Sequence, residues 1–190
     1  MKTRPTPDRR KFADQRDELE YLYHKLLYWL YDREDRARAR AFAERLARLL
    51  SKASPGHDAI FPEECWSLIC EAKDDLGGAI RHRKNEIRLM KRLHEISRNT
   101  AQQEDVFRLH GYDDLSDRLD LLAVLYHDSG NLDKAINTLQ ESKQVCEKHG
   151  VKFDGVDILQ EYLQEKANSQ EDPDGKISLS SVSPQAKRLI

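Results

Sequence analysis

Apolar residues recur at every third or fourth position through most of the chain, which is the spacing that places them on one face of an α-helix. The clearest case lies between Ser116 and Gly150, where two such stretches flank the sequence Ser129-Gly130-Asn131. Glycine adopts the positive φ that ends a helix, and serine and asparagine compete with helical hydrogen bonds. The pattern therefore predicts two antiparallel amphipathic helices joined by a tight turn.

This predicted hairpin places small apolar residues among larger ones. Its apolar stripes are Leu119, Leu122, Ala123 and Tyr126 in the first helix and Leu132, Ala135, Ile136 and Leu139 in the second. Ala123 and Ala135 are small enough to let two helices approach closely while their larger neighbours interdigitate. We expect these two alanines to lie where the helices cross.

The same stretch resembles a tetratricopeptide repeat, a helix-turn-helix unit of 34 residues. With Ser116 as its first position, the family pattern of large, small and turn residues falls on Leu119, Leu122, Ala123, Tyr126, Gly130 and Ala135. The chain departs from the pattern at Ser142, in the second small position, and at Glu147, where the family has its terminal proline. The missing proline predicts that the second helix continues towards Gly150.

Further periodic stretches predict helices on both sides of this hairpin. We expect them at about 12–31, 35–51, 62–75, 77–98 and 156–166, with a short helical piece at Val106, Phe107 and Leu109. The segment Asp74–Ile80 resembles Gly130–Ile136, which indicates an internal repeat with an offset of 56 residues. The expected fold is all-α, with antiparallel helical hairpins stacked as a short right-handed solenoid of the tetratricopeptide type.

Composition supports this interpretation and sets the expected domain limits. Charged residues make up 35% and hydrophobic residues 38% of the 190 residues, a mixture that favours helix. We expect a flexible basic arm at 1–11, one helical-repeat domain at 12–167 and a disordered tail at 168–190. Three cysteines form no disulfide framework, and neither a signal peptide nor a membrane-spanning run is evident, so we expect a soluble cytoplasmic protein.

Motifs that carry chemistry are missing from the sequence. His94-Glu95 lacks the second histidine of a zinc-protease helix, because position 98 is Arg98. Cys65 and Cys70 are too far apart for a zinc knuckle or a redox pair, and we expect them to be buried in helices. Gly77-Gly78 is not followed by the lysine and hydroxyl residue of a phosphate loop. We therefore expect no enzymatic activity, no metal and no cofactor.

The resemblance to the repeat family implies a binding groove lined by the first helix of the hairpin. Its groove positions fall on Asp117, Asp120, Val124, His127 and Asp128. Asp120 and Val124 replace the lysine or asparagine with which the family holds a carboxylate-ended peptide, so a basic segment is the better fit to this acidic groove. The hypothesis is a non-catalytic adaptor that binds another protein. The alternative, that these aspartates only solvate a short stack, remains open.

Two other functions compete with the adaptor. A nucleic-acid-binding regulator would use the basic stretch Arg81, Arg83, Lys84, Arg88, Lys91 and Arg92. We regard nucleic acid as the less favoured partner, because no aromatic residue is interleaved for base stacking and the following region is acidic enough to neutralise these cations. That region, Asp113–Asp174, holds 15 acidic and 6 basic residues. A homo-oligomeric structural element would instead associate through the aromatic first helix, which contains Tyr21, Tyr23, Tyr28, Trp29 and Tyr31.

Overall fold

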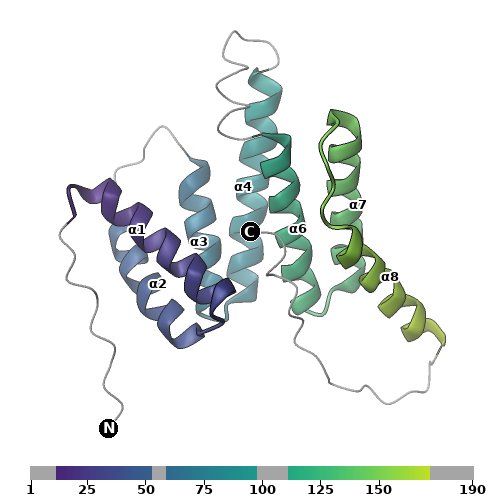
Figure 1. Ribbon diagram of the computed structural model, residues 1–190, viewed down its shortest axis with the longest axis horizontal. Helices are drawn as coiled ribbons and strands as arrows, with labels where there is room; N and C mark the ends of the chain where they lie inside the picture. The colour runs from purple at the N-terminus through teal and green to yellow at the C-terminus, as the bar shows by residue number, and fades with distance from the viewer. Residues whose placement is uncertain (1–11, 53–58, 98–110, 172–190) are drawn as a thin grey trace. The chain divides into compact units, whose positions relative to one another are not determined.

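The computed structural model describes residues 12–52, 59–97 and 111–171. Within these ranges every regular element is a helix, which confirms the all-α fold class (Figure 1). The elements are α1 (Gln15–Leu27), η1 (Tyr28–Asp32), α2 (Arg36–Leu50), α3 (Ile60–Ala72), α4 (Leu76–Ser97), α6 (Tyr112–Asp128), α7 (Leu132–His149) and α8 (Val156–Glu171). The predicted arm at 1–11 and the predicted helical piece around Val106 lie outside the described residues.

The chain gathers into two compact units, residues 1–79 and residues 80–190, and the boundary falls inside α4. We call them the first and the second unit. The single repeat domain expected over 12–167, and the right-handed stacking within it, stay predictions.

The first unit contains the hairpin α1–α2 and the helix α3. Aspartates begin both helices of the hairpin: Asp14 accepts a hydrogen bond from Asp17 N at 2.9 Å, and Asp35 accepts one from Arg38 N at 3.0 Å. α1 passes into η1, a short π-helical segment with a wider turn. The core of the hairpin consists of Leu22, Leu26, Ala39, Ala43 and Leu46, all of which are fully buried.

The end of α3 and the start of α4 approach each other closely in the first unit. A Cβ atom placed on Gly78 would lie 2.7 Å from Cys70 Sγ, so a glycine is needed for this approach. Ser67 Oγ donates a hydrogen bond to Ala79 O at 3.1 Å across the same contact. The sequence Asp74–Ile80 therefore does form a turn between two helices, as its likeness to Gly130–Ile136 predicts.

The second unit contains the predicted hairpin as α6 and α7, which lie side by side in Figure 1. Gly130 in the connecting turn has a φ of 78°, and Asn131 begins α7 by accepting a hydrogen bond from Lys134 N. Ala123 and Ala135 are both fully buried in one core cluster, as predicted from their size. α7 continues to His149 and ends at Gly150, whose φ is 69°, which confirms that the second helix runs on to this glycine.

α8 packs against α7 and adds Ile158 and Tyr162 to the same core. Its other side leaves Val156 and Leu163 each 44% exposed. The helix continues to Glu171, so residues 168–171 are helical although the sequence assigns them to the disordered tail. Two hydrogen bonds across one turn hold this end: Gln164 Nε2 donates to Asn168 Oδ1, and Ser169 Oγ donates to Glu165 O, both at 2.9 Å.

Candidate functional site

The acidic face expected from the sequence lies on α6, but its members differ in accessibility. Asp117, Val124 and His127 are half-buried and Asp128 is exposed, whereas Asp120 is only 1% exposed. The five positions therefore do not form one open groove.

Asp120 is a buried carboxyl group that lacks a well-formed hydrogen bond within the described residues, although the Ser142 hydroxyl is close enough to act on its pKa. Within the described part of the chain, neither of its carboxyl oxygens has a hydrogen-bond partner. The loop before α8 closes over it, since a Cβ atom on Gly155 would lie 2.9 Å from Asp120 Oδ2. The nearby hydroxyls of Ser116 and Ser142 lie 2.8 Å from each other, and Ser142 Oγ donates to Ser116 O at 3.3 Å. These hydroxyls are thus engaged with one another.

Asp120 and Asp117 ionise less readily than ordinary aspartates. Burial raises the pKa of Asp120 to about 7; the Ser142 hydroxyl acts in the opposite direction, and the charges of Asp117 and Asp154 raise the value further. Burial also raises the pKa of Asp117 to about 6, against the opposing charge of Arg118. Near pH 7, Asp117 is therefore mostly charged while Asp120 is partly protonated.

Asp154 completes this group of carboxyls, and the sequence analysis did not include it. It lies on the loop between α7 and α8, its side chain is 51% exposed, and it forms an ion pair with Lys152. Its charge contributes to the raised pKa of both Asp117 and Asp120. We call Asp117, Asp120 and Asp154 the acidic cluster. A sequence pattern for helix faces does not find Asp154, because this residue reaches α6 only through the fold of a loop.

The other end of the predicted face makes contacts within the second unit. The ring of His127 stacks on that of Tyr162 with a centroid distance of 4.3 Å, and His127 Nε2 lies 2.9 Å from Glu165 Oε2. These contacts fix α8 to α6. His127 therefore has a structural role in docking α8.

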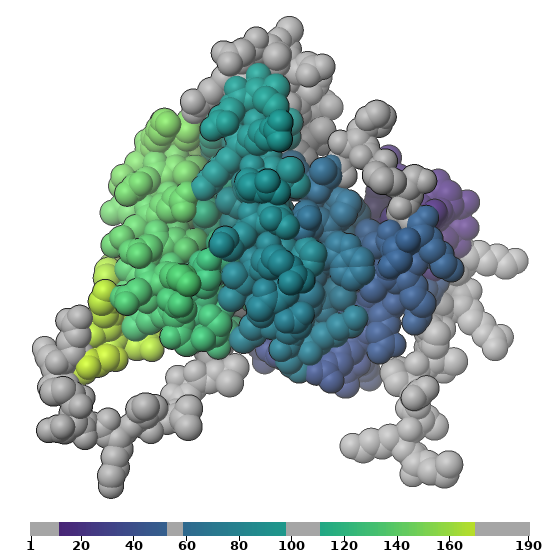
Figure 2. All heavy atoms as spheres, turned by 180° about the vertical axis from the view of Figure 1, so that it is seen from behind, coloured from purple at the N-terminus to yellow at the C-terminus, as the bar shows by residue number. Residues whose placement is uncertain are grey.

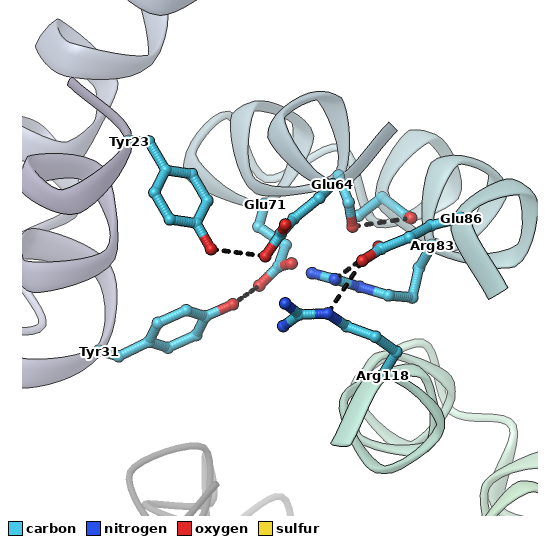
Figure 3. Close-up of polar contacts among 9 residues, drawn as sticks. Tyr23, Tyr31, Glu64, Glu71, Arg83, Glu86 and Arg118 are labelled. Atoms are coloured by element: carbon cyan, nitrogen blue, oxygen red, sulfur yellow. Dashed lines mark hydrogen bonds and ion pairs between the residues drawn. The ribbon is translucent and has the colours of Figure 1, made fainter. Parts of the chain in front are cut away.

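The basic stretch divides into engaged and exposed cations. Arg83 is 1% exposed and forms an ion pair with Glu86 at 2.7 Å, and Arg118 of α6 reaches the same carboxylate at 2.9 Å (Figure 3). Lys91 forms an ion pair with Glu141 of α7. The other four cations of the stretch, Arg81, Lys84, Arg88 and Arg92, are exposed. The prediction that the acidic region neutralises these cations therefore holds for only part of the helix.

The aromatic first helix is largely engaged within the first unit. Tyr23 Oη donates to Glu64 Oε1 at 2.5 Å, and Tyr31 Oη donates to Glu71 Oε2 at 2.7 Å (Figure 3). The ammonium group of Lys25 lies 5.8 Å from the ring centroid of Tyr21 and 5.6 Å from that of Tyr28. These two rings are therefore already in cation–π contact with a lysine of the same chain.

The remaining chemical features are few. Cys65 and Cys70 are buried, which confirms the prediction for these helix cysteines, and Cys146 is buried as well. Among the described residues no group of three His, Cys, Asp or Glu side chains is arranged to hold a metal ion. None of the described helices is both long and apolar enough to cross a membrane.

Comparison of the chain with protein-family models, with curated proteins and with solved structures gave no match.

Proposed function

We propose that the protein is a non-catalytic helical adaptor that binds a basic segment of another protein at the acidic cluster. The observation that carries the proposal is a group of three carboxyls in which, among the described residues, only Asp154 forms an ion pair, with Lys152. Asp120 is buried with neither oxygen in a well-formed hydrogen bond among the described residues, and Asp117 and Asp154 add charge of the same sign. Perturbed carboxyls of this kind are typical of binding sites.

A lysine or arginine side chain of the partner would complete this electrostatic arrangement. The cation would contact Asp117 and Asp154, which are accessible to solvent, while Asp120 adds negative potential from beneath them. A cation favours the charged form of a carboxyl and lowers its pKa. Binding would therefore release protons, and its affinity would fall as pH is lowered through about 7 and 6, where these two aspartates become protonated.

The architecture proposed for this adaptor is a short tetratricopeptide-like stack. Three features support it: the fully buried pair Ala123 and Ala135, the positive φ of 78° at Gly130, and the cover that α8 gives to α7. The last helix of such an array covers the open apolar side of its neighbour, which is the position of α8.

The test is a titration of the full chain into a fluorescein-labelled 12-residue peptide of alternating lysine and alanine. We expect binding that is about three- to tenfold weaker at pH 5.5 than at pH 8, since exposed ion pairs contribute roughly 0.2–1 kcal/mol each. Asp117→Asn combined with Asp154→Asn should weaken binding at pH 8 by a similar factor.

The matched control is Glu44→Gln combined with Glu161→Gln, which makes the same change in net charge at two exposed carboxyls elsewhere. Equal losses in the two double variants would show that only net charge attracts the peptide, and the proposed site would be rejected. If the test succeeds, capture of partners with the wild type and the acidic-cluster variant, followed by mass spectrometry, identifies the natural partner.

A further inference from the structure

One face of α4 presents a row of four cations to solvent. Arg81, Lys84, Arg88 and Arg92 are exposed and follow one another at intervals of three, four and four residues. With 3.6 residues per turn, this spacing confines them to an arc of about 80° and spreads them over about 16 Å of the helix. We call these four residues the basic row. In Figure 2, α4 (teal) forms part of the surface in view.

The basic row has no ion pair within the described part of the chain, although acidic residues are plentiful there. The two other cations of the stretch are engaged, Arg83 by Glu86 and Lys91 by Glu141. On the arc itself lies one acid, Glu95, which follows Arg92 by three residues. The face therefore keeps an excess of positive charge.

α4 holds this row in a fixed arrangement because its opposite side is packed. Ala79, Ile87 and Met90 are at most 4% exposed, and the ion pair of Arg118 with Glu86 joins α4 to α6 in the second unit. The spacing of the four cations is therefore set before any ligand arrives. Binding therefore does not have to order the backbone of this helix, which lowers its cost in conformational entropy.

We propose that the basic row binds the phosphate backbone of a nucleic-acid duplex. A duplex carries one negative charge per about 1.7 Å of its axis, so the length of the row faces roughly ten phosphates. A single strand is a poorer fit, because proteins hold it by stacking its bases on aromatic rings, and α4 contains no Phe, Tyr or Trp. An acidic protein segment is also a poorer fit, because the arc from Arg81 to Arg92 lacks the apolar centre of a protein interface.

The test uses the full chain and a labelled 20-base-pair DNA duplex of mixed sequence, followed by fluorescence anisotropy between 25 and 200 mM NaCl. We expect a Kd of roughly 10⁻⁴–10⁻⁶ M and a slope of log K against log salt of about −3 to −4, as expected for four phosphate contacts. Arg88→Gln with Arg92→Gln should lower the affinity at least tenfold at low salt and reduce the slope by about 2.

The control variant is Arg48→Gln with Lys148→Gln, which removes two exposed cations outside the basic row. Circular dichroism establishes that each variant is folded, and Arg81→Gln with Lys84→Gln serves as a second variant of the row. An equal loss in the control, or tighter binding of a poly-glutamate peptide than of the duplex, would overturn the proposal. The basic-peptide titration tests the acidic cluster in a separate experiment, so the failure of one proposal can be told from the failure of the other.

Discussion

A carboxylate that is taken out of water loses the hydration that stabilises its charge, and one unit of pKa shift corresponds to about 1.4 kcal/mol. Asp120, with a pKa raised to about 7, shows this effect most clearly. A group whose pKa is higher in the folded than in the unfolded chain stabilises the fold most at low pH. For Asp117 and Asp120 this stabilisation is complete below about pH 4 and is lost as pH rises through 6 and 7.

Replacement of Asp120 by asparagine should therefore stabilise the protein at pH 8 and have little effect at pH 5. The amide removes the buried charge at nearly the same side-chain size, and it also removes the repulsion from the charges of Asp117 and Asp154. We expect the Tm to rise by several degrees at pH 8, with thermal unfolding followed by circular dichroism at both pH values.

The comparison for this prediction is Glu161→Gln, at an exposed carboxyl on α8, which should shift the Tm little at either pH. If Asp120→Asn changed the Tm by the same amount at pH 5 and pH 8, the charge of Asp120 would not be what destabilises the folded protein.

The role of Asp120 could not be predicted from its position in the helix pattern. The pattern places Asp120 on the same face as Asp117, and both do belong to the acidic cluster. Whether that face is open depends on Gly155, which comes 35 residues later and lies directly over Asp120. Such a contact is set by the course of a loop, and helical periodicity carries no information about it.

At the scale of helices, the sequence predicts the features that depend on the spacing of nearby residues, such as helix ends and buried faces. The turn at Gly130 and the helix end at Gly150 follow from glycine at positive φ, and the burial of Ala123 and Ala135 in one core cluster follows from their small size. Arg83 and Glu86 are three residues apart, a spacing that places them side by side on a helix, so their ion pair could have been predicted from the sequence. The contact of Tyr23 with Glu64 joins residues 41 apart, and no local pattern indicates it.

Replacement of Ala135 by leucine should overpack the crossing of α6 and α7. Ala135 is fully buried, so the additional carbon atoms have no space without movement of a helix or a strained rotamer. We expect a loss of about 1–3 kcal/mol in the free energy of unfolding, measured by urea denaturation. Asn137→Leu places the same side chain at an exposed position of α7 and should cost much less. Equal losses would show that Ala135 does not limit the approach of the helices.

At the scale of the molecule, a formal net charge of −2 hides a strong separation of charge. The sequence shows that Asp113–Asp174 is acidic and that α4 is basic, but it does not show which cations are engaged. The structure shows that Lys91 and Arg83 are paired, whereas the basic row has no ion pair with any residue of the second unit that the structure describes. The acidic cluster and the basic row thus lie in one unit and carry charges of opposite sign. The field of each surface would act on the ligand proposed for the other.

This coupling should depend on salt, because the distance over which charges interact is about 30 Å at 10 mM and about 8 Å at 150 mM ionic strength. Asp117→Asn with Asp154→Asn removes negative charge from the second unit without a change in the basic row. We therefore expect this variant to bind the DNA duplex about two- to fivefold more tightly than the wild type at 10 mM salt. The reason is that fewer negative charges on the protein then repel the negatively charged duplex. At 150 mM salt the two affinities should converge, because charges more than about 8 Å apart are then largely screened. If the gain persisted at 150 mM, the duplex would lie against Asp117 or Asp154 themselves, and the two surfaces would have to be treated as one site.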